Sequence, residues 1–183
     1  MITKTFRIAL DSTADFRRYC QRCQRELQLI GIRATSRVPA QLELSADLDL
    51  GDRPLEELYL IVARKMQELK TLPVRATFDP IAFSEERGTL YLPVRGTAIR
   101  RVFDELNAEL QFLGIFGNLS LPYGPKVLLA EEVSKPHMLE AINLLTDIGQ
   151  FSGEIESEAV LIYEDNGNYC QAVFRMDAWP AEA

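Results

Sequence analysis

The sequence predicts an α+β fold, in which helices cover the outer faces of largely antiparallel sheets. Segments whose apolar residues recur at helical spacing alternate with short segments whose apolar residues occupy every second position. Two pairs of these strand-like segments are joined by short polar turns, which is typical of β-hairpins. Because hairpins pair antiparallel strands, their presence excludes a simple doubly wound parallel sheet.

A strand followed by a helix is expected at the N-terminus. Residues 6–10 alternate between apolar and other side chains, which predicts a half-buried strand. Ser12 and Asp15 then form a helix-start signal, with the serine hydroxyl expected to cap a backbone N–H. The helix is expected to end at Gly31. Its apolar stripe is formed by Phe16, Cys20, Cys23, Leu27 and Ile30.

Further strands are expected between this helix and the C-terminus. The polar turn 84–88 is expected to close one hairpin, and Asp165–Asn168 a second, because Asn-Gly supplies the positive φ of a tight turn. The strands that the alternation predicts cover 41–44, 74–83, 89–94, 126–131, 159–163 and 169–176.

Three more helices are expected. The second opens near Pro54 and stops near Pro73, because proline fits the first turn of a helix but cannot continue one. The third is expected to have Thr97 as its cap and Gly114 just past its end. A short fourth helix covers 134–148.

Chain length and composition are those of one compact domain. The 183 residues are 47% hydrophobic and 26% charged, which allows a single domain over 1–183 to bury a substantial core without disulfides or metals. The first ten residues contain no long apolar run. We therefore expect no membrane span, no leader peptide and a cytoplasmic location.

The charge is distributed unevenly along the chain. A net charge of −7 argues against a broad nucleic-acid-binding surface, which depends on many phosphate contacts. Residues 1–40, however, carry eight Lys and Arg against three Asp and Glu, a net +5, so that the remainder carries −12. The simpler interpretation is a solvated helix with scattered arginines, and the alternative is a docking surface for an acidic partner.

The cysteines and the sole histidine are expected to be structural. Cys20 and Cys23 form a C-x-x-C inside the predicted helix, where a spacing of three places both on one buried face. A redox pair would gain from a position at the helix N-terminus, and a zinc site would need Cys170 and His137 as further ligands. No metal or cofactor is therefore expected, and the usual nucleotide, hydrolase and zinc motifs are absent.

Two strand segments that contain proline stand out, 37–44 with Pro39 and 123–130 with Pro125. Together with the order of elements along nearly the whole chain, they resemble the 2H phosphoesterases, the superfamily of 2′,5′ RNA ligase-like and cyclic phosphodiesterase-like proteins. The resemblance implies one domain of two lobes with a central cleft, to which each lobe contributes a strand carrying an H-x-T-x motif.

All four motif residues of that family are replaced in this chain. Gln41 and Glu43 stand at the histidine and threonine positions of the first motif, and Lys126 and Leu128 at those of the second. In the family, the histidines are thought to act as base and acid on a phosphoester, while the threonines hold phosphate oxygens. Tyr123 could line the same cleft, although a strand aromatic is more often packing.

The replacements do not suit acid–base chemistry at neutral pH. The amide of Gln41 exchanges no proton, and an unperturbed lysine has a pKa of about 10.4, so Lys126 would stay protonated. A bridge between Glu43 and Lys126 would move both groups further from neutrality. Glu43 would also repel a phosphate by about 4 kcal/mol at about 4 Å and an effective dielectric near 20, although Lys126 could screen that repulsion.

These residues favour a non-catalytic binding or interaction protein with a degenerate active site. Its partner would be a small molecule or a protein, with a nucleotide or an RNA end as one possibility. The alternative is a divergent phosphodiesterase or RNA-end-processing enzyme that acts on 2′,3′-cyclic or 2′,5′-linked nucleotides, with Glu43 and Lys126 in altered roles. A third hypothesis is a structural subunit without a ligand.

Overall fold

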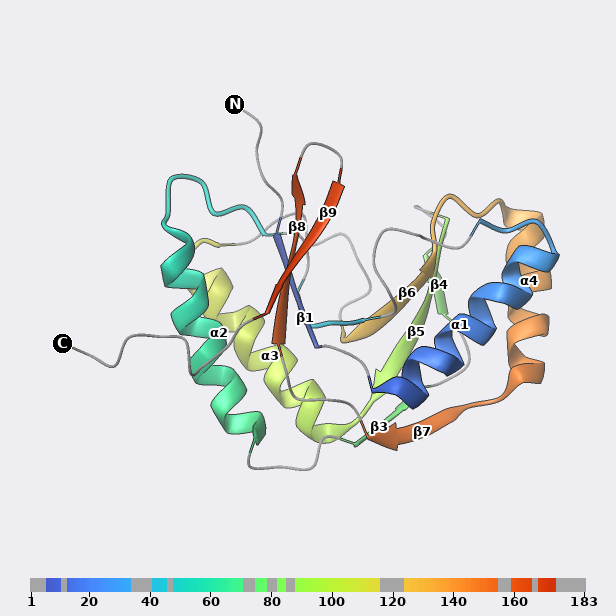
Figure 1. The fold of residues 1–183 in the computed structure, drawn as a ribbon, viewed down its shortest axis with the longest axis horizontal. Helices are drawn as coiled ribbons and strands as arrows, with labels where there is room; N and C mark the ends of the chain where they lie inside the picture. Colours follow the sequence, from blue (N-terminus) through green and yellow to red (C-terminus); the bar gives the residue numbers. More distant parts are fainter. Residues whose placement is uncertain are drawn as a thin grey trace.

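The structure is a computed structural model, and it describes residues 6–10, 13–33, 41–45, 48–70, 75–78, 82–84, 88–115, 124–154, 159–165 and 168–173. These residues form four helices and nine strands (Figure 1). The helices are α1 (Ala14–Leu29), α2 (Leu55–Lys70), α3 (Thr97–Phe112) and α4 (Lys135–Ile148). None of them is long and apolar enough to cross a lipid bilayer.

The strands pair antiparallel throughout, in the order β7-β3-β5-β6-β2-β1-β8-β9, with β4 also pairing with β5. The predicted α+β class with largely antiparallel strands is therefore confirmed. The strands are β1 (Phe6–Leu10), β2 (Leu42–Glu43), β3 (Arg75–Phe78), β4 (Ala82–Ser84), β5 (Thr89–Arg95), β6 (Lys126–Ala130), β7 (Phe151–Glu154), β8 (Ala159–Asp165) and β9 (Asn168–Val173).

The central strands separate an apolar from a more polar sheet face, because successive side chains of a strand point to opposite sides. The apolar face belongs to the main hydrophobic core, together with side chains from all four helices. Its strand residues include Ile8, Leu10, Leu42, Leu90, Leu92, Val94, Val127 and Leu129. The helices therefore cover this face of the sheet.

The helices pack as two pairs. In Figure 1, α2 and α3 lie together at one end of the molecule and α1 and α4 at the other. The predicted stripe of α1 is buried at Phe16, Cys20, Cys23 and Leu27, and Ile30 is half-buried at the helix end. The helical periodicity of the sequence thus predicted which side of α1 faces the sheet.

Two predicted helix caps were wrong by one residue. The N-cap of α1 is Thr13, whose Oγ1 accepts a hydrogen bond from the Phe16 N–H at 3.3 Å, whereas Ser12 lies outside the described residues. Thr97 is the first residue of α3, and its N-cap is Gly96, which has no side chain to cap with. Adjacent hydroxyl, glycine and acidic residues give similar start signals, so the backbone geometry decides among them.

The prediction of one strand over 74–83 was also wrong. Two strands, β3 and β4, lie along the same edge of β5, with Phe78 opposite Val94 and Ser84 opposite Thr89. Pro80, which has no N–H to give to a ladder, belongs to the segment between them, outside the described residues. Strand β7 was not predicted, because four residues with one large apolar side chain give no alternation.

The cap of α1 allows a direct test. Thr13→Ala removes the hydroxyl that accepts from Phe16 N–H, and we expect the free energy of unfolding to fall by about 1 kcal/mol in urea denaturation. Ser12→Ala, at the position that the sequence pattern favoured, is the matched control and should change it by less than about 0.5 kcal/mol. The reverse ranking would restore Ser12 as the cap.

Candidate binding site

The two segments that resemble the family motifs are neighbouring strands in the structure. Glu43 on β2 lies directly opposite Lys126 on β6 and, on the other side, opposite Ala9 on β1. Leu128 on β6 lies opposite Tyr91 on β5. The period of two then puts a set of side chains on the face opposite the core, which we call the polar sheet face; it includes Arg7, Gln41, Glu43, Tyr91, Lys126 and Leu128, together with Ala9 and Pro93.

The polar residues of this face are buried, except Arg7, which is half-buried. Gln41, Glu43 and Lys126 expose 4%, 8% and 6% of their surface, and Tyr91 exposes 7%. Leu128 is half-buried. Burying charged groups is costly unless they are paired or hydrogen-bonded, so these side chains need partners within the fold.

Glu43 has its ion-pair partner on β1. Arg7 Nη1 lies 3.3 Å from Glu43 Oε1, and the two side chains are 26% and 10% exposed. The sequence suggested a bridge between Glu43 and Lys126, and the register does set these two opposite each other. Among the described residues, Glu43 forms an ion pair with Arg7. The sequence reasoning missed Arg7 as a member of the site, although its place between Phe6 and Ile8 predicted the correct face.

Lys126 lies over an aromatic ring. Its Nζ is 5.9 Å from the centroid of the Tyr91 ring, within the range of a cation–π interaction, which is worth about 2 kcal/mol when both groups are desolvated. Burial raises the pKa of the Tyr91 hydroxyl above its ordinary value. Tyr91 therefore stays protonated at neutral pH and can donate a hydrogen bond.

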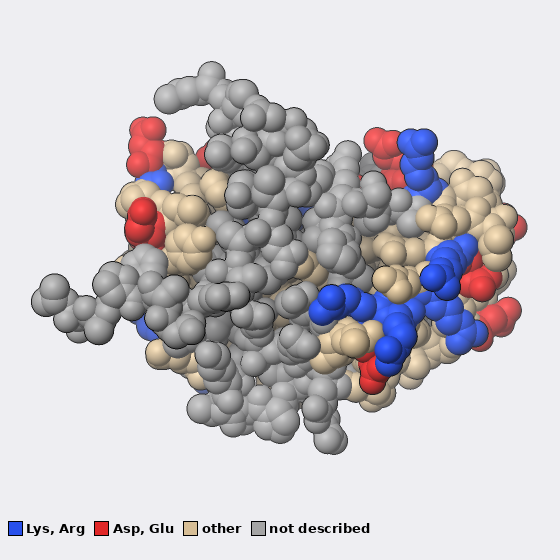
Figure 2. Space-filling view, in the orientation of Figure 1, with Lys and Arg blue, Asp and Glu red and all other residues tan. Residues whose placement is uncertain are grey.

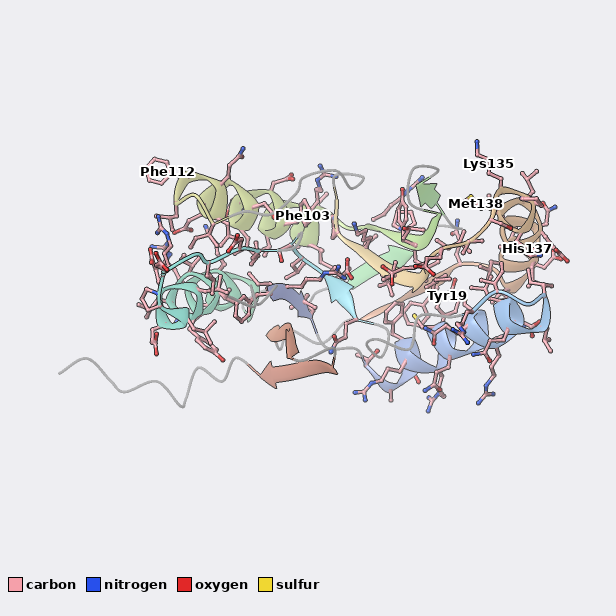
Figure 3. The ribbon with its side chains drawn as sticks, turned by 90° about the horizontal axis from the view of Figure 1, so that it is seen from above. Tyr19, Phe103, Phe112, Lys135, His137 and Met138 are labelled. Carbon is pink, nitrogen blue, oxygen red and sulfur yellow. The ribbon has the colours of Figure 1, made fainter. Side chains whose placement is uncertain are left out.

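The remaining predicted residues take different places. The side-chain oxygen of Gln41 is buried and accepts no hydrogen bond from the described residues, while the residue makes other interactions. Tyr123 lies outside the described residues. His137 is exposed in the first turn of α4, with its Nδ1 3.0 Å from the Ser134 hydroxyl, and Figure 3 shows it at the end of the molecule away from α2 and α3.

The polar sheet face is suited to binding more than to proton transfer. Its described side chains provide two cations, one carboxylate, one amide and one protonated phenol. None is an imidazole, and the single histidine of the chain is on α4. Groups of these types exchange no proton near pH 7 at their ordinary pKa values.

The cysteines of α1 are part of the core and form no reactive site. Cys20 and Cys23 are free and buried, and the Tyr19 hydroxyl beside them donates to Gly149 O at 2.9 Å. Burial raises the pKa of Cys20, and it raises that of Cys23 to about 11. Among the described residues, no group of His, Cys, Asp and Glu could hold a metal ion.

The burial of these thiols predicts slow chemical modification. At about pH 8, where thiolate is the reacting species, we expect native Cys20 and Cys23 to react with a disulfide reagent at least about tenfold more slowly than the cysteine of a Leu29→Cys variant. Leu29 is 79% exposed and on the same helix. Peptide mass spectrometry separates these sites from Cys170, and equal rates would contradict the buried placement.

The Arg7–Glu43 pair predicts a measurable coupling. In a double-mutant cycle of Arg7→Gln and Glu43→Gln, followed by urea denaturation, we expect a coupling free energy of about 1–3 kcal/mol because both groups are largely desolvated. The matched control is the exposed Arg53–Glu57 pair, at 2.9 Å, for which about 0.5 kcal/mol is expected. Equal couplings would show that the buried pair is no stronger than a surface one.

Comparison with known proteins supports the fold. No protein-family model and no curated protein sequence matches the chain. Solved structures do: E. coli LigT in complex with 3′-AMP (14% identity, TM-score 0.64), a Thermus thermophilus protein (16%, 0.63) and a structure described as a phosphoesterase (14%, 0.61). Each of these three alignments covers 93% of this chain and 95% of the matched chain. The chain therefore has the fold of LigT and of this phosphoesterase, as its resemblance to the 2H phosphoesterases led us to expect.

Proposed function

We propose that this chain is a non-catalytic binding protein on a 2H phosphoesterase-like fold, which holds a small anionic ligand of the nucleotide type at its polar sheet face. The fold supports the nature of the ligand, because LigT has been crystallised with 3′-AMP, with NADP+ and with ATP. The ligand would lie where β2 and β6 run side by side, in the central cleft that the family resemblance implies.

The ion pair of Glu43 with Arg7 is the observation that carries the proposal. A guanidinium 3.3 Å from a carboxylate favours the charged form of that carboxylate, which then acts as a hydrogen-bond acceptor. No imidazole replaces it on this face, since the only histidine belongs to α4. The described residues of this face therefore provide no acid–base couple suited to phosphoester cleavage at neutral pH.

The charges of the face are compatible with an anion. Arg7 and Lys126 against Glu43 leave a net charge of +1. The repulsion between Glu43 and a phosphate, about 4 kcal/mol at about 4 Å, is offset by the guanidinium beside the carboxylate. The Lys126 ammonium and the Tyr91 hydroxyl are donors of the kind that bind phosphate or carboxylate oxygens.

The alternative function is a divergent phosphodiesterase or RNA-end-processing enzyme. It is favoured by the register, which sets Glu43 and Lys126 opposite each other on the two strands that correspond to the family motifs. In that case Lys126 would stabilise the developing charge on the phosphate. Glu43 would have to leave its ion pair with Arg7 and take up a proton during turnover.

Binding and turnover can be measured on the same protein. We expect 3′-AMP, ATP or NADP+ to raise the unfolding free energy with the logarithm of ligand concentration, by about 2.7 kcal/mol at a concentration 100 times the Kd. Lys126→Met should abolish this stabilisation, whereas Lys135→Met, the same change at an exposed position on α4, should leave it unchanged. Thermal denaturation against ligand concentration is the measurement.

The alternative enzymatic function is tested by incubating the protein with 2′,3′-cyclic nucleotides, 2′,5′-linked dinucleotides and RNA with a cyclic-phosphate end. Chromatography then detects any product. We expect no product above the buffer control. Product that disappears in both Glu43→Ala and Lys126→Ala would overturn the proposal and establish the enzyme. If the ligands give no stabilisation and the substrates give no product, the structural-subunit hypothesis is favoured.

A further inference from the structure

The outward side of α1 carries a row of arginines. Arg17, Arg18, Arg22 and Arg25 are all exposed, while the opposite side of the helix is buried in the core. Figure 2 shows Lys and Arg side chains gathered over the part of the surface that α1 occupies in Figure 1. The asymmetry noted in the sequence is therefore a local surface feature, which we call the arginine face.

Part of this positive charge has no ion-pair partner within the described part of the chain. Arg18 pairs with Asp15 in the first turn of the helix. Arg22 and Arg25, and Arg33 just beyond the helix, are exposed and form no ion pair with any described residue. Exposed guanidinium groups that stay unpaired in a chain of net charge −7 point to an anionic partner.

The spacing of these residues makes the row linear. Arg18, Arg22 and Arg25 follow one another at intervals of four and three, so they lie along one side of the helix. At a rise of 1.5 Å per residue, the row is about 10 Å long. Gln21 and Gln28 are exposed on the same side of the helix, and their amides add neutral hydrogen-bond donors. A linear array of guanidinium and amide donors suits a chain of phosphates.

The same surface does not suit a membrane or a protein partner. The apolar stripe of α1, formed by Phe16, Cys20, Cys23 and Leu27, is buried in the core, so the helix has no continuous apolar side to insert into lipid. Among its described residues, only Leu29 is a large apolar side chain with substantial exposure, at 79%. A protein interface generally needs a desolvated apolar or aromatic centre, which this face lacks.

We propose that the arginine face of α1 binds the phosphate backbone of a polynucleotide, without reading its bases. This inference is independent of the ligand proposed for the polar sheet face, because α1 packs on the opposite, apolar side of the sheet. It also agrees with the net charge of the chain, because a row of three or four cations is a narrow contact. Affinity should therefore be weak, with a Kd on the order of 10⁻⁴ M at about 0.15 M salt.

Fluorescence anisotropy of a labelled single-stranded RNA of about 12 nucleotides tests the proposal, since single-strand sites span about 4–16 nucleotides. In the Arg22→Gln/Arg25→Gln variant we expect at least tenfold weaker binding at low salt. Because each phosphate contact contributes about 0.7 to the slope of log Kd against log salt, the slope should decrease by about 1.4. Sequences of different base composition should bind alike.

The matched control is Arg64→Gln/Arg101→Gln, which removes the same charge from α2 and α3, where both arginines pair with glutamates. It should bind within about twofold of the unsubstituted protein. Glutamine preserves helix propensity in both variants, and circular dichroism checks that they fold. Lys126→Met should bind RNA normally, which separates this proposal from the ligand site.

Several outcomes would overturn the proposal. One is RNA binding by Arg22→Gln/Arg25→Gln as strong as that of the unsubstituted protein, and another is no RNA binding by the unsubstituted protein at low salt. Equal or tighter binding to poly-glutamate would identify an acidic protein segment as the partner. Equal or tighter binding to phosphatidylserine vesicles would identify a membrane surface. A dimer that dissociates only in the Arg22→Gln/Arg25→Gln variant would identify a second copy of the chain.

Discussion

The structure depends on a very short strand at the middle of the sheet. Strand β2 has only two residues, yet it pairs with β1 on one side and with β6 on the other, and so joins the two halves of the sheet. Because side chains alternate across a strand, this one register sets Leu42 into the core and Glu43 onto the opposite face. A slip of one residue would bury a carboxylate among apolar side chains.

The charged residues of this protein are stabilised in two different ways. On the polar sheet face, Arg7, Glu43 and Lys126 are largely removed from water, and the ion pair and the aromatic ring beside them compensate for lost hydration. On α1, the arginines are exposed to water, and one of them, Arg18, pairs with Asp15 on the same helix. Salt screens the interactions of exposed charges of the second kind strongly, and those of buried charges of the first kind much less.

Sequence patterns predicted most elements but not their exact ends. The helical stripe of α1 and the glycines after α1 and α3 were predicted correctly, and Gly31 and Gly114 do have positive φ. The cap at Thr13 and the division of the 74–83 segment into β3 and β4 were not. Caps depend on the backbone angles of single residues, and strand ends depend on which edge is available for pairing.

By itself, the sequence determined which residues share a strand face, where the helices run, and that a single histidine cannot support a two-histidine mechanism. These properties follow from local periodicity and composition. Only the tertiary structure decided that Glu43 pairs with Arg7, that Lys126 lies over Tyr91, and that both pairs belong to one surface. Arg7 and Glu43 are 36 residues apart, and the contact arises from the pairing of β1 with β2. Strand pairing between distant segments depends on how the whole chain packs, and no local pattern encodes it.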